Sequence, residues 1–216
     1  MAEHATAYDD PGTPEEVSRR TFLARATVVL GGAVGVTLAV TLIGSLVPTP
    51  EILAGSKTWA PLDSNEFRQL EQSATGVPMK IEFRHKSQDG YLTSESKDYV
   101  WGLRLSPADE QRMRSERPDL FAQRGGEVTF DVFSMGFVIF SPICPHLGCR
   151  YNWDEGMGKF ICPCHGSVYD KFGKHEAGPA PRGLDPLPLR EQNGEAEITW
   201  IQYETAVPDR VIIAYS

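Results

Sequence analysis

The pattern of apolar and polar positions divides the chain into a tail, an apolar run and a longer mixed region. Residues 1–17 are polar, as expected for a tail without regular structure. Residues 26–47 then carry no charge over 22 positions. At about 1.5 Å per residue, a helix of this length crosses a hydrocarbon core of about 30 Å. The pattern therefore predicts a tail over residues 1–25 and a transmembrane helix over residues 26–47.

The flanks of this run indicate an anchor that stays attached, and they give its orientation. A cleaved signal peptide is the alternative, but Pro48-Thr49-Pro50 follows the run in place of an Ala-x-Ala cleavage site. Arg19, Arg20 and Arg25 precede the run, whereas a lone Lys57 follows it. Because positively charged flanks stay in the cytoplasm, we expect the tail inside a prokaryotic cell and the rest of the chain on the outer face of the membrane.

The segments on either side of the run carry two further signals. Ser18-Arg19-Arg20-Thr21-Phe22-Leu23 looks like a twin-arginine export signal, because the full pattern stands directly before the apolar run; two arginines that merely flank a membrane helix are the alternative. Residues 48–60 contain Pro, Gly and Ser breaks, the composition of a linker. The composition predicts a linker, and a passive connector is its simplest form.

The remaining residues, 61–216, predict an antiparallel β head. Short segments rich in Val, Ile, Phe, Tyr and Trp alternate with glycine breaks. The predicted strands are Met79–His85, Asp98–Arg104, Glu127–Phe133, Phe137–Ser141, Lys159–Cys162, Ala196–Glu204 and Arg210–Tyr215. A capping-box pattern predicts a helix start at Asp63–Glu66, and residues 106–124 are predicted to be a charged, exposed insertion. The predicted fold class is mainly β, with a single N-terminal transmembrane helix.

Charge and cysteine usage narrow the function classes. The net charge is −8 and the sequence has no basic run to dock on phosphates, so a nucleic-acid partner is not expected. All four cysteines fall within residues 144–164, which concentrates the candidate chemistry in one short part of the chain.

That chemistry lies in two short loops bounded by Pro and Gly. The first reads Cys144-Pro-His146-Leu-Gly-Cys149, and the second reads Cys162-Pro-Cys164-His165-Gly-Ser167-Val-Tyr169. Thiolates and imidazoles at this spacing can hold a metal centre. Two thiolates and two imidazoles also suit a structural zinc site, although the second cysteine of each loop makes zinc the weaker explanation.

These loops closely resemble those of the Rieske iron–sulfur proteins, whose boxes read C-x-H-x-G-C and C-x-C-H-G-S. The resemblance covers roughly residues 142–182, which would form a small cluster-binding subdomain. In the respiratory members of this family the segment that corresponds to residues 48–60 is a hinge, so the resemblance implies a hinge there as well. It implies one Rieske-type [2Fe–2S] cluster, with Cys144 and Cys162 on one iron and His146 and His165 on the other.

The resemblance also implies a disulfide between Cys149 and Cys164 that ties the two loops together. A disulfide beside an iron–sulfur site argues for a head outside the cytoplasm. Because a cluster has to be inserted into folded protein in the cytoplasm, the head would cross the membrane already folded, in agreement with a twin-arginine signal.

Residues around the boxes match further family positions. Ser167 and Tyr169 correspond to hydroxyls that bond a cluster sulfide and a cysteine sulfur, here that of Cys144, and so raise the reduction potential. Gly178-Pro179-Ala180-Pro181 resembles the proline loop that covers the cluster, and Leu147 is expected to form an exposed docking patch with these prolines. Ordinary packing and an ordinary surface turn are the alternatives. We expect His4, His85 and His175 to be structural or solvated.

The function implied by this resemblance is electron transfer within a larger complex. The chain would be the Rieske subunit of a prokaryotic cytochrome bc- or b6f-type quinol–cytochrome c reductase, an enzyme only as part of that complex. Its partners would be a cytochrome b-type subunit, a c-type cytochrome, the membrane and a quinol, either menaquinol or ubiquinol. His146 and His165 would be the catalytic residues, since the second nitrogen of each ring would accept a proton from the quinol as the iron accepts an electron.

Three other functions fit parts of the same sequence. An electron-transfer subunit of another exported oxidoreductase, such as arsenite oxidase, also resembles this chain in its leader and disulfide. A soluble Rieske ferredoxin or oxygenase component is disfavoured by Cys149, Cys164 and the anchor. A membrane-anchored zinc module leaves the same two cysteines unexplained.

Overall fold

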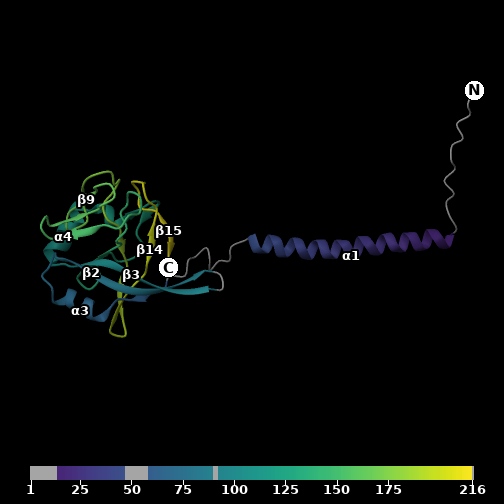
Figure 1. Ribbon diagram of the computed structural model, residues 1–216, viewed down its shortest axis with the longest axis horizontal. Helices are drawn as coiled ribbons and strands as arrows, with labels where there is room; N and C mark the ends of the chain where they lie inside the picture. Colours follow the sequence, from purple (N-terminus) through teal and green to yellow (C-terminus); the bar gives the residue numbers. More distant parts are fainter. Residues whose placement is uncertain (1–13, 47–57, 90–91, 216) are drawn as a thin grey trace, which may run out of the picture. The chain divides into compact units, whose positions relative to one another are not determined.

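The computed structural model describes residues 14–46, 58–89 and 92–215, which belong to two units, Met1–Leu53 and Ala54–Ser216 (Figure 1). The start of the tail, with His4, and the predicted linker up to residue 57 lie outside the described residues.

The described part of the first unit is the helix α1 (Pro14–Leu46, 33 residues). Its stretch Ser18–Gly44 is long and apolar enough to cross a membrane, and none of that stretch is buried inside the protein. The Thr27 and Thr37 hydroxyls donate to carbonyls four residues earlier, so these polar groups are paired within the helix, as a lipid environment requires. The helix fits a single-pass membrane protein. It begins at residue 14 rather than at 26, so the paired arginines of the candidate export signal are helical.

An antiparallel sheet of four strands forms the centre of the second unit, in the order β11-β6-β3-β2. β2 (Pro78–Asp89) and β3 (Leu92–Arg104) make a long hairpin, visible in Figure 1, and both extend beyond the predicted strands. β3 pairs with β6 (Phe137–Phe140), and β6 pairs with β11 (Pro186–Leu187). The four residues of β6 are all buried, which fixes this strand in the middle of the sheet.

A second antiparallel sheet carries the two cysteine–histidine loops, in the order β10-β9-β8-β7. Its strands are β7 (Asn152–Asp154), β8 (Lys159–Ile161), β9 (Val168–Tyr169) and β10 (His175–Ala177). The first loop connects β6 to β7, and the second connects β8 to β9. Both loops therefore begin and end on strands, which hold their ends in place.

Smaller elements complete the unit. A three-stranded sheet contains β1 (Ala60–Pro61), β13 (Glu195–Ile198) and β12 (Leu189–Gln192), and two hairpins pair β4 (Ala122–Gln123) with β5 (Gly126–Glu127) and β14 (Ile201–Tyr203) with β15 (Ile212–Tyr215). The described fold is mainly β and antiparallel, with one long apolar helix near the N-terminus, so the predicted fold class is confirmed.

Two of the predicted strands differ from the structure. The strand predicted over Glu127–Phe133 is wrong, because only Glu127 belongs to a strand and the rest is irregular. Its apolar residues pack against the core from a loop: Val132 is buried, and Phe130 and Phe133 contact the core. The segment predicted as one strand over Ala196–Glu204 is two strands, β13 and β14, separated at Thr199–Trp200.

The predicted helix start is confirmed, with one change in its cap. Helix α3 (Ser64–Gln72) is capped by the Asp63 carboxylate, which accepts the backbone N–H groups of Asn65 and Glu66. Glu66 does not close a reciprocal capping box; its carboxylate accepts the backbone N–H of Glu82 on β2. This contact ties the helix to the central sheet.

Residues 106–124 are packed more firmly than an exposed insertion. They form α4 (Pro107–Glu116), which starts with a capping box between Ser106 and Asp109, and the short 3₁₀ helix η1 (Pro118–Phe121). Met113 and Leu120 are completely buried although most of their neighbours are charged. The insertion therefore contributes to the core and anchors one side of the loop-bearing sheet.

One hydrophobic core joins the central sheet to the loop-bearing sheet. Its buried members include Leu103 and Val138 from the central sheet and Phe160 and Tyr169 from the other. The Trp101 and Phe160 rings meet edge-on with centroids 5.4 Å apart, a favoured aromatic geometry. Because β8 and β9 are packed in this way, the loop between them rises from a rigid base.

Candidate metal centre

The two loops share one backbone arrangement. In box 1 (Cys144–Cys149), the Cys144 N–H donates to the Cys149 carbonyl at 2.7 Å, and the Gly148 N–H donates back to the Cys144 carbonyl at 3.1 Å. In box 2 (Cys162–Ser167), Cys162 and Gly166 make the equivalent bonds at 2.8 and 3.0 Å.

Glycine at the fifth position of each box allows this turn. Gly148 has a φ of 79° and Gly166 a φ of 73°, in the left-handed region that favours glycine. The two boxes therefore present their side chains from matching backbone frames.

The thiols of the predicted ligand set are more deeply buried than its imidazoles. Cys144 and Cys162 are free thiols with 0% and 1% exposure, whereas His146 is half-buried and His165 is exposed. The two imidazole rings lie edge-to-face with centroids 4.8 Å apart. The structure thus brings the two histidines together at the surface, above a base of buried sulfur.

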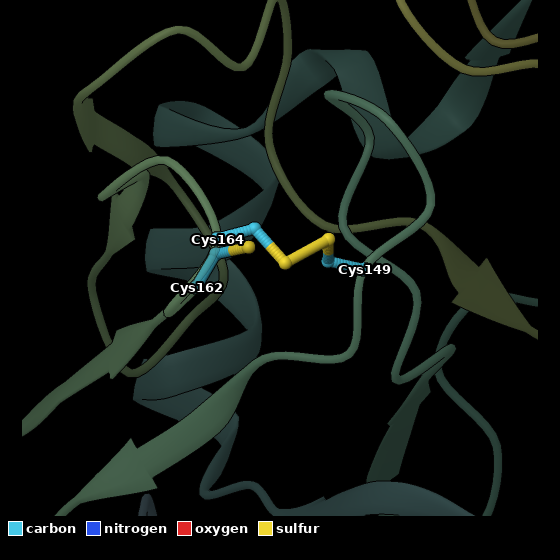
Figure 2. Close-up of side chains that lie close together, drawn as sticks. All are labelled: Cys149, Cys162 and Cys164. Carbon is cyan, nitrogen blue, oxygen red and sulfur yellow. A yellow bond between two sulfur atoms is a disulfide. The ribbon is translucent and has the colours of Figure 1, made fainter.

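Cys149 and Cys164 form a disulfide, which confirms the predicted pair (Figure 2). Its Cα atoms are 6.5 Å apart, and it links the last residue of box 1 to the middle of box 2. The Cys162 sulfur lies within 4.8 Å of both disulfide sulfurs, so three sulfur atoms gather at this point. A disulfide sulfur has no thiolate to offer a metal; of these three, only the Cys162 sulfur can be a ligand.

The surroundings of Cys144 explain why a metal would suit it. Burial raises the pKa of the Cys144 thiol, the Tyr169 hydroxyl opposes that rise through a hydrogen bond, and the neighbouring Cys162 adds to it. A buried thiol of this kind stays protonated unless a positive charge stabilises its thiolate. A metal ion supplies that charge, because coordination deprotonates a thiol.

The donor set fits a two-iron, two-sulfur group. His146 Nδ1 is buried and has no hydrogen-bond partner in the described part of the chain. Buried polar atoms normally have a partner, and a metal ion facing Nδ1 would be one. Two buried thiols and two adjacent imidazoles, one of them with an unpaired inward nitrogen, match the ligands of a Rieske-type centre.

Tyr169 and Ser167 are buried beside these groups. The Tyr169 hydroxyl lies 3.1 Å from the Cys144 sulfur. Burial raises the pKa of Tyr169 far above its usual range, so the hydroxyl keeps its proton and would donate to the sulfur once Cys144 is a metal-bound thiolate. The Ser167 hydroxyl accepts the Ala180 backbone N–H at 3.2 Å and so ties box 2 to the segment after it.

That segment, the proline loop (Gly178–Pro181), packs directly on box 2. Gly178 has a φ of 89°, and a Cβ atom there would lie 2.5 Å from Ser167 Cα and 2.6 Å from the Gly166 carbonyl oxygen. Only glycine allows this approach. Gly178, Pro179 and Pro181 are exposed, as is 57% of Leu147.

Three buried charged residues near the boxes were not predicted from the sequence. Arg182, Asp185 and Arg210 are 7%, 3% and 3% exposed, and Arg182 directly follows the proline loop. One feature of the sequence could have indicated them: Asp185 lies in the apolar stretch Gly183-Leu-Asp-Pro-Leu-Pro-Leu189, where a buried charge needs a partner of opposite charge.

Arg117 is a fourth buried charge, with 2% exposure. It donates to the Phe172 and Leu184 carbonyls at 2.8 and 3.1 Å and pairs with Asp119 through both carboxylate oxygens. Arg117 thus joins the insertion to the chain on either side of the proline loop.

The other histidines do not join the site. His175 lies on β10, where its ring packs edge-on against Tyr169 and its buried Nε2 has no partner among the described residues. His85 belongs to β2, and its side chain lies outside the described groups.

Comparison with known proteins decides the family of this region. Residues 114–188 match the family described as "Rieske [2Fe-2S] domain". The chain contains a Rieske domain. The matched residues run from α4 to β11 and include both boxes, the disulfide and the proline loop.

The curated relatives agree with this assignment over a short span. A cytochrome b6-f complex iron-sulfur subunit of Prochlorococcus marinus (strain AS9601) is 45% identical over 74 residues, 34% of this chain and 38% of the relative. The corresponding subunit of Synechococcus sp. (strain CC9605) is 41% identical over 69 residues, 32% of this chain and 39% of the relative. The match thus spans less than two fifths of these relatives.

Solved structures of Rieske proteins are more distant. The soluble domain of the Rieske protein II from Sulfolobus acidocaldarius shares 18% identity, with a TM-score of 0.38 over 70% of this chain and 82% of that one. A structure titled "Hyperthermophilic respiratory Complex III" shares 19% identity, with a TM-score of 0.33 over 82% of this chain and 98% of that one. The assignment of the Rieske domain rests on the matched sequence.

Proposed function

We propose that this chain is the Rieske subunit of a prokaryotic cytochrome bc- or b6f-type complex. In this role it accepts one electron from quinol at a cytochrome b-type subunit and passes it to a c-type cytochrome. The observation that carries the proposal is the Tyr169 hydroxyl on the Cys144 sulfur. A hydrogen bond to a ligand sulfur stabilises the reduced centre and raises its potential, as quinol oxidation requires.

The residues that would hold the centre are Cys144 and Cys162 on one iron and His146 and His165 on the other. The [2Fe–2S] group supplies one-electron transfer when bound. Cys144 and Cys162 keep its inner side away from water, because both thiols are buried. The disulfide and the proline loop hold box 1 and box 2 around it.

His146 and His165 handle the proton. Each ring would hold iron through one nitrogen, and its second nitrogen would then be left to accept a hydrogen bond, and then the proton, of a quinol hydroxyl. The half-buried position of His146 and the exposed position of His165 support this role, since a quinol has to reach them from outside. Leu147, Pro179 and Pro181, exposed around the histidines, would form the docking surface.

The first unit supports a membrane location for this activity. Helix α1 fits a single anchor, and we propose that the N-terminus lies in the cytoplasm and the head on the outer face. A disulfide in the head agrees with an oxidising compartment, and Ser18–Leu23 would direct export of the folded head. The curated relatives are named as cytochrome b6-f subunits, which does not favour the arsenite oxidase alternative.

The test is electron paramagnetic resonance of the full-length protein in detergent, reduced once with ascorbate and once with dithionite, together with metal analysis. A Rieske-type signal already present with ascorbate means a high-potential centre and supports quinol oxidation. A signal that appears only with dithionite would contradict it and indicate a ferredoxin-like role. Zinc without a signal, in protein made with a working cluster-assembly system, would exclude the iron–sulfur centre.

A further inference from the structure

The C-terminal hairpin reaches box 1 from outside the matched domain. The match to the Rieske family ends at residue 188, whereas β14 and β15 begin at residues 201 and 212. Between them, the C-terminal loop (Glu204–Arg210) places the Ala206 N–H 2.9 Å from the Pro145 carbonyl. Pro145 is the residue between the ligands Cys144 and His146, so this bond holds the peptide that carries His146.

Arg182 fastens the same loop to the end of the proline loop. Its guanidinium donates to the Val207 carbonyl at 2.6 Å and to the Glu204 carbonyl at 2.7 Å. It also forms a two-point pair with the Asp185 carboxylate at 2.9 and 2.8 Å. A planar guanidinium can satisfy these four contacts at once, which a lysine cannot.

Arg210 completes the connection at the far end of the C-terminal loop. Its Nε donates to Asp185 at 2.9 Å, and Nη1 donates to the Asp119 and Ala122 carbonyls. Asp185 therefore lies between two buried guanidinium groups, one following the proline loop and one ending the C-terminal loop. A carboxylate shared in this way links both loops: Arg182 would otherwise be buried without a charge partner, and Arg210 would retain only its longer contact with Asp119 at 3.4 Å.

His146 depends on such a support more than an ordinary buried histidine does. A ligand histidine is usually oriented by a hydrogen bond from its other ring nitrogen. In His146 the inward Nδ1 is the nitrogen that would face the metal, and the other ring nitrogen, Nε2, has no hydrogen-bond partner among the described residues. The direction of the ring therefore depends on its packing against His165 and on its backbone, which Ala206 holds on the N-terminal side.

We propose that Arg182, Asp185, Arg210 and the C-terminal loop form a positioning brace that sets the orientation of His146. The brace acts through the Pro145 peptide and touches neither the centre nor the quinol. The effect of the brace on the centre rests on the proposed iron–sulfur site. Its effect on the backbone of box 1 does not depend on whether a centre is bound.

The experiment compares the full-length protein, purified in detergent, with the variants Arg182→Gln and Arg182→Lys. Lysine retains the positive charge but cannot make the four hydrogen bonds of the guanidinium. An effect shared by both variants therefore comes from the loss of these bonds and not from the loss of the charge. Arg190→Gln is the matched control, because Arg190 is a half-exposed residue that pairs with Glu197 on β13 and has no bond to either box. Should the glutamine variant fail to fold, the lysine variant carries the comparison.

Two measurements are made on each protein. The first is hydrogen–deuterium exchange over residues 142–151. We expect both Arg182 variants to exchange on the order of fivefold to tenfold faster there than wild type, the factor for the loss of about one hydrogen bond. The second is the paramagnetic resonance spectrum of the reduced centre, in which we expect shifted g values and broader lines for the Arg182 variants and no change for Arg190→Gln.

The brace is overturned if the Arg182 variants melt at a lower temperature with unchanged exchange over residues 142–151 and an unchanged spectrum. That result would reduce the network to general stabilisation of the head. Failure of the proposed function looks different: metal analysis of the wild type would show no iron, or the centre would reduce only with dithionite. The exchange measurement decides the brace in either of those cases.

Discussion

Box 1 and box 2 have the same backbone hydrogen bonds and are supported in different ways. Box 2 is covered at close range by the proline loop, which starts only eleven positions after Ser167, at Gly178, and packs on it without space for a Cβ atom. Box 1 is held by distant segments: the C-terminal loop at Pro145 and β3 through a pair between Arg150 and Asp98. Two loops with the same backbone hydrogen bonds thus have different supports: box 2 is covered by a nearby segment, and box 1 is held by two distant parts of the chain.

The difference suggests how the site divides its tasks. The box with local support carries the exposed His165 and a covalent link to the other box. The box with distant support carries His146, whose ring packs against that of His165. Alteration of the head far from the site should therefore affect box 1 first, while box 2 should respond mainly to changes in its own neighbours.

The largest expected effect comes from removing a buried thiol from either box. Cys144→Ser and Cys162→Ser each leave a weakly basic hydroxyl where the centre needs a thiolate. We expect both variants to lose the visible absorption and the paramagnetic signal of the centre completely. If one of them retained a full complement of iron, the proposed ligand set would be incorrect for that box.

The next effect comes from breaking the covalent link between the boxes. The double variant Cys149→Ser with Cys164→Ser opens a link of sequence separation 15, and a loop of this size contributes about 3 kcal/mol. We expect that loss in the free energy of unfolding, measured with urea under non-reducing conditions. Wild-type protein treated with a reductant should lose a similar amount, and a much smaller loss would show that the proline loop and the brace hold the boxes without the disulfide.

Gly178→Ala tests the local support of box 2. The new methyl group would overlap Ser167 Cα, and alanine is strained at this φ, so we expect a loss of about 2–4 kcal/mol. Gly158→Ala is the matched control, since Gly158 has a φ of 63° and open space around it. The control should lose only about 1–2 kcal/mol from backbone strain. Equal losses in the two variants would show that the close packing at Gly178 does not contribute to the free energy of unfolding.

Tyr169→Phe separates the effect of the Tyr169 hydroxyl on the reduction potential from the packing of its ring. The variant removes one hydrogen bond to the Cys144 sulfur and leaves the ring packed. We expect the reduction potential to fall by about 40 mV, the equivalent of ~1 kcal/mol for one electron, with the centre fully retained. The measurement is a redox titration followed by paramagnetic resonance. An unchanged potential would contradict the proposed tuning role of this hydroxyl.

Arg150→Gln should have the smallest effect. The Arg150–Asp98 pair has good two-point geometry at 2.7 and 2.8 Å, but the Arg150 side chain is 42% exposed. Pairs of this kind contribute about 0.2–1 kcal/mol and weaken with salt. We expect a loss within that range that disappears in 1 M salt, measured by urea unfolding. A loss that persisted at high salt would assign the contribution to packing of Arg150 on the Tyr99 ring.

Local sequence signals predicted most of the site and part of the fold. The boxes were evident because cysteine, histidine and glycine carry the chemistry and the turn geometry in the side-chain types themselves. Asp63 was recognisable as a helix cap for the same reason. The strands of the β2–β3 hairpin were predicted in part, as Met79–His85 and Asp98–Arg104, but their full length and their pairing were not.

What the sequence did not predict depends on contacts between distant segments. The bond from Ala206 to Pro145 joins two backbone groups, and neither side chain indicates it. Val132 occurs in an apolar segment that has the composition of a strand, yet it is buried from an irregular loop, because filling the core requires no particular backbone shape. Arg117 was assigned to an exposed face since its neighbours are charged, and its burial depends on carbonyls 55 and 67 positions away.

The position of Cys162 has a consequence for biogenesis. Its sulfur lies within 4.8 Å of both sulfurs of the Cys149–Cys164 disulfide, the proximity at which a thiolate can attack and rearrange such a bond. Iron bound to Cys162 would act as a protecting group, because a coordinated sulfur is no longer a free nucleophile. If Cys162 holds iron as proposed, the safe order of maturation would be metal first and oxidation second, with the disulfide formed only after the cofactor is loaded.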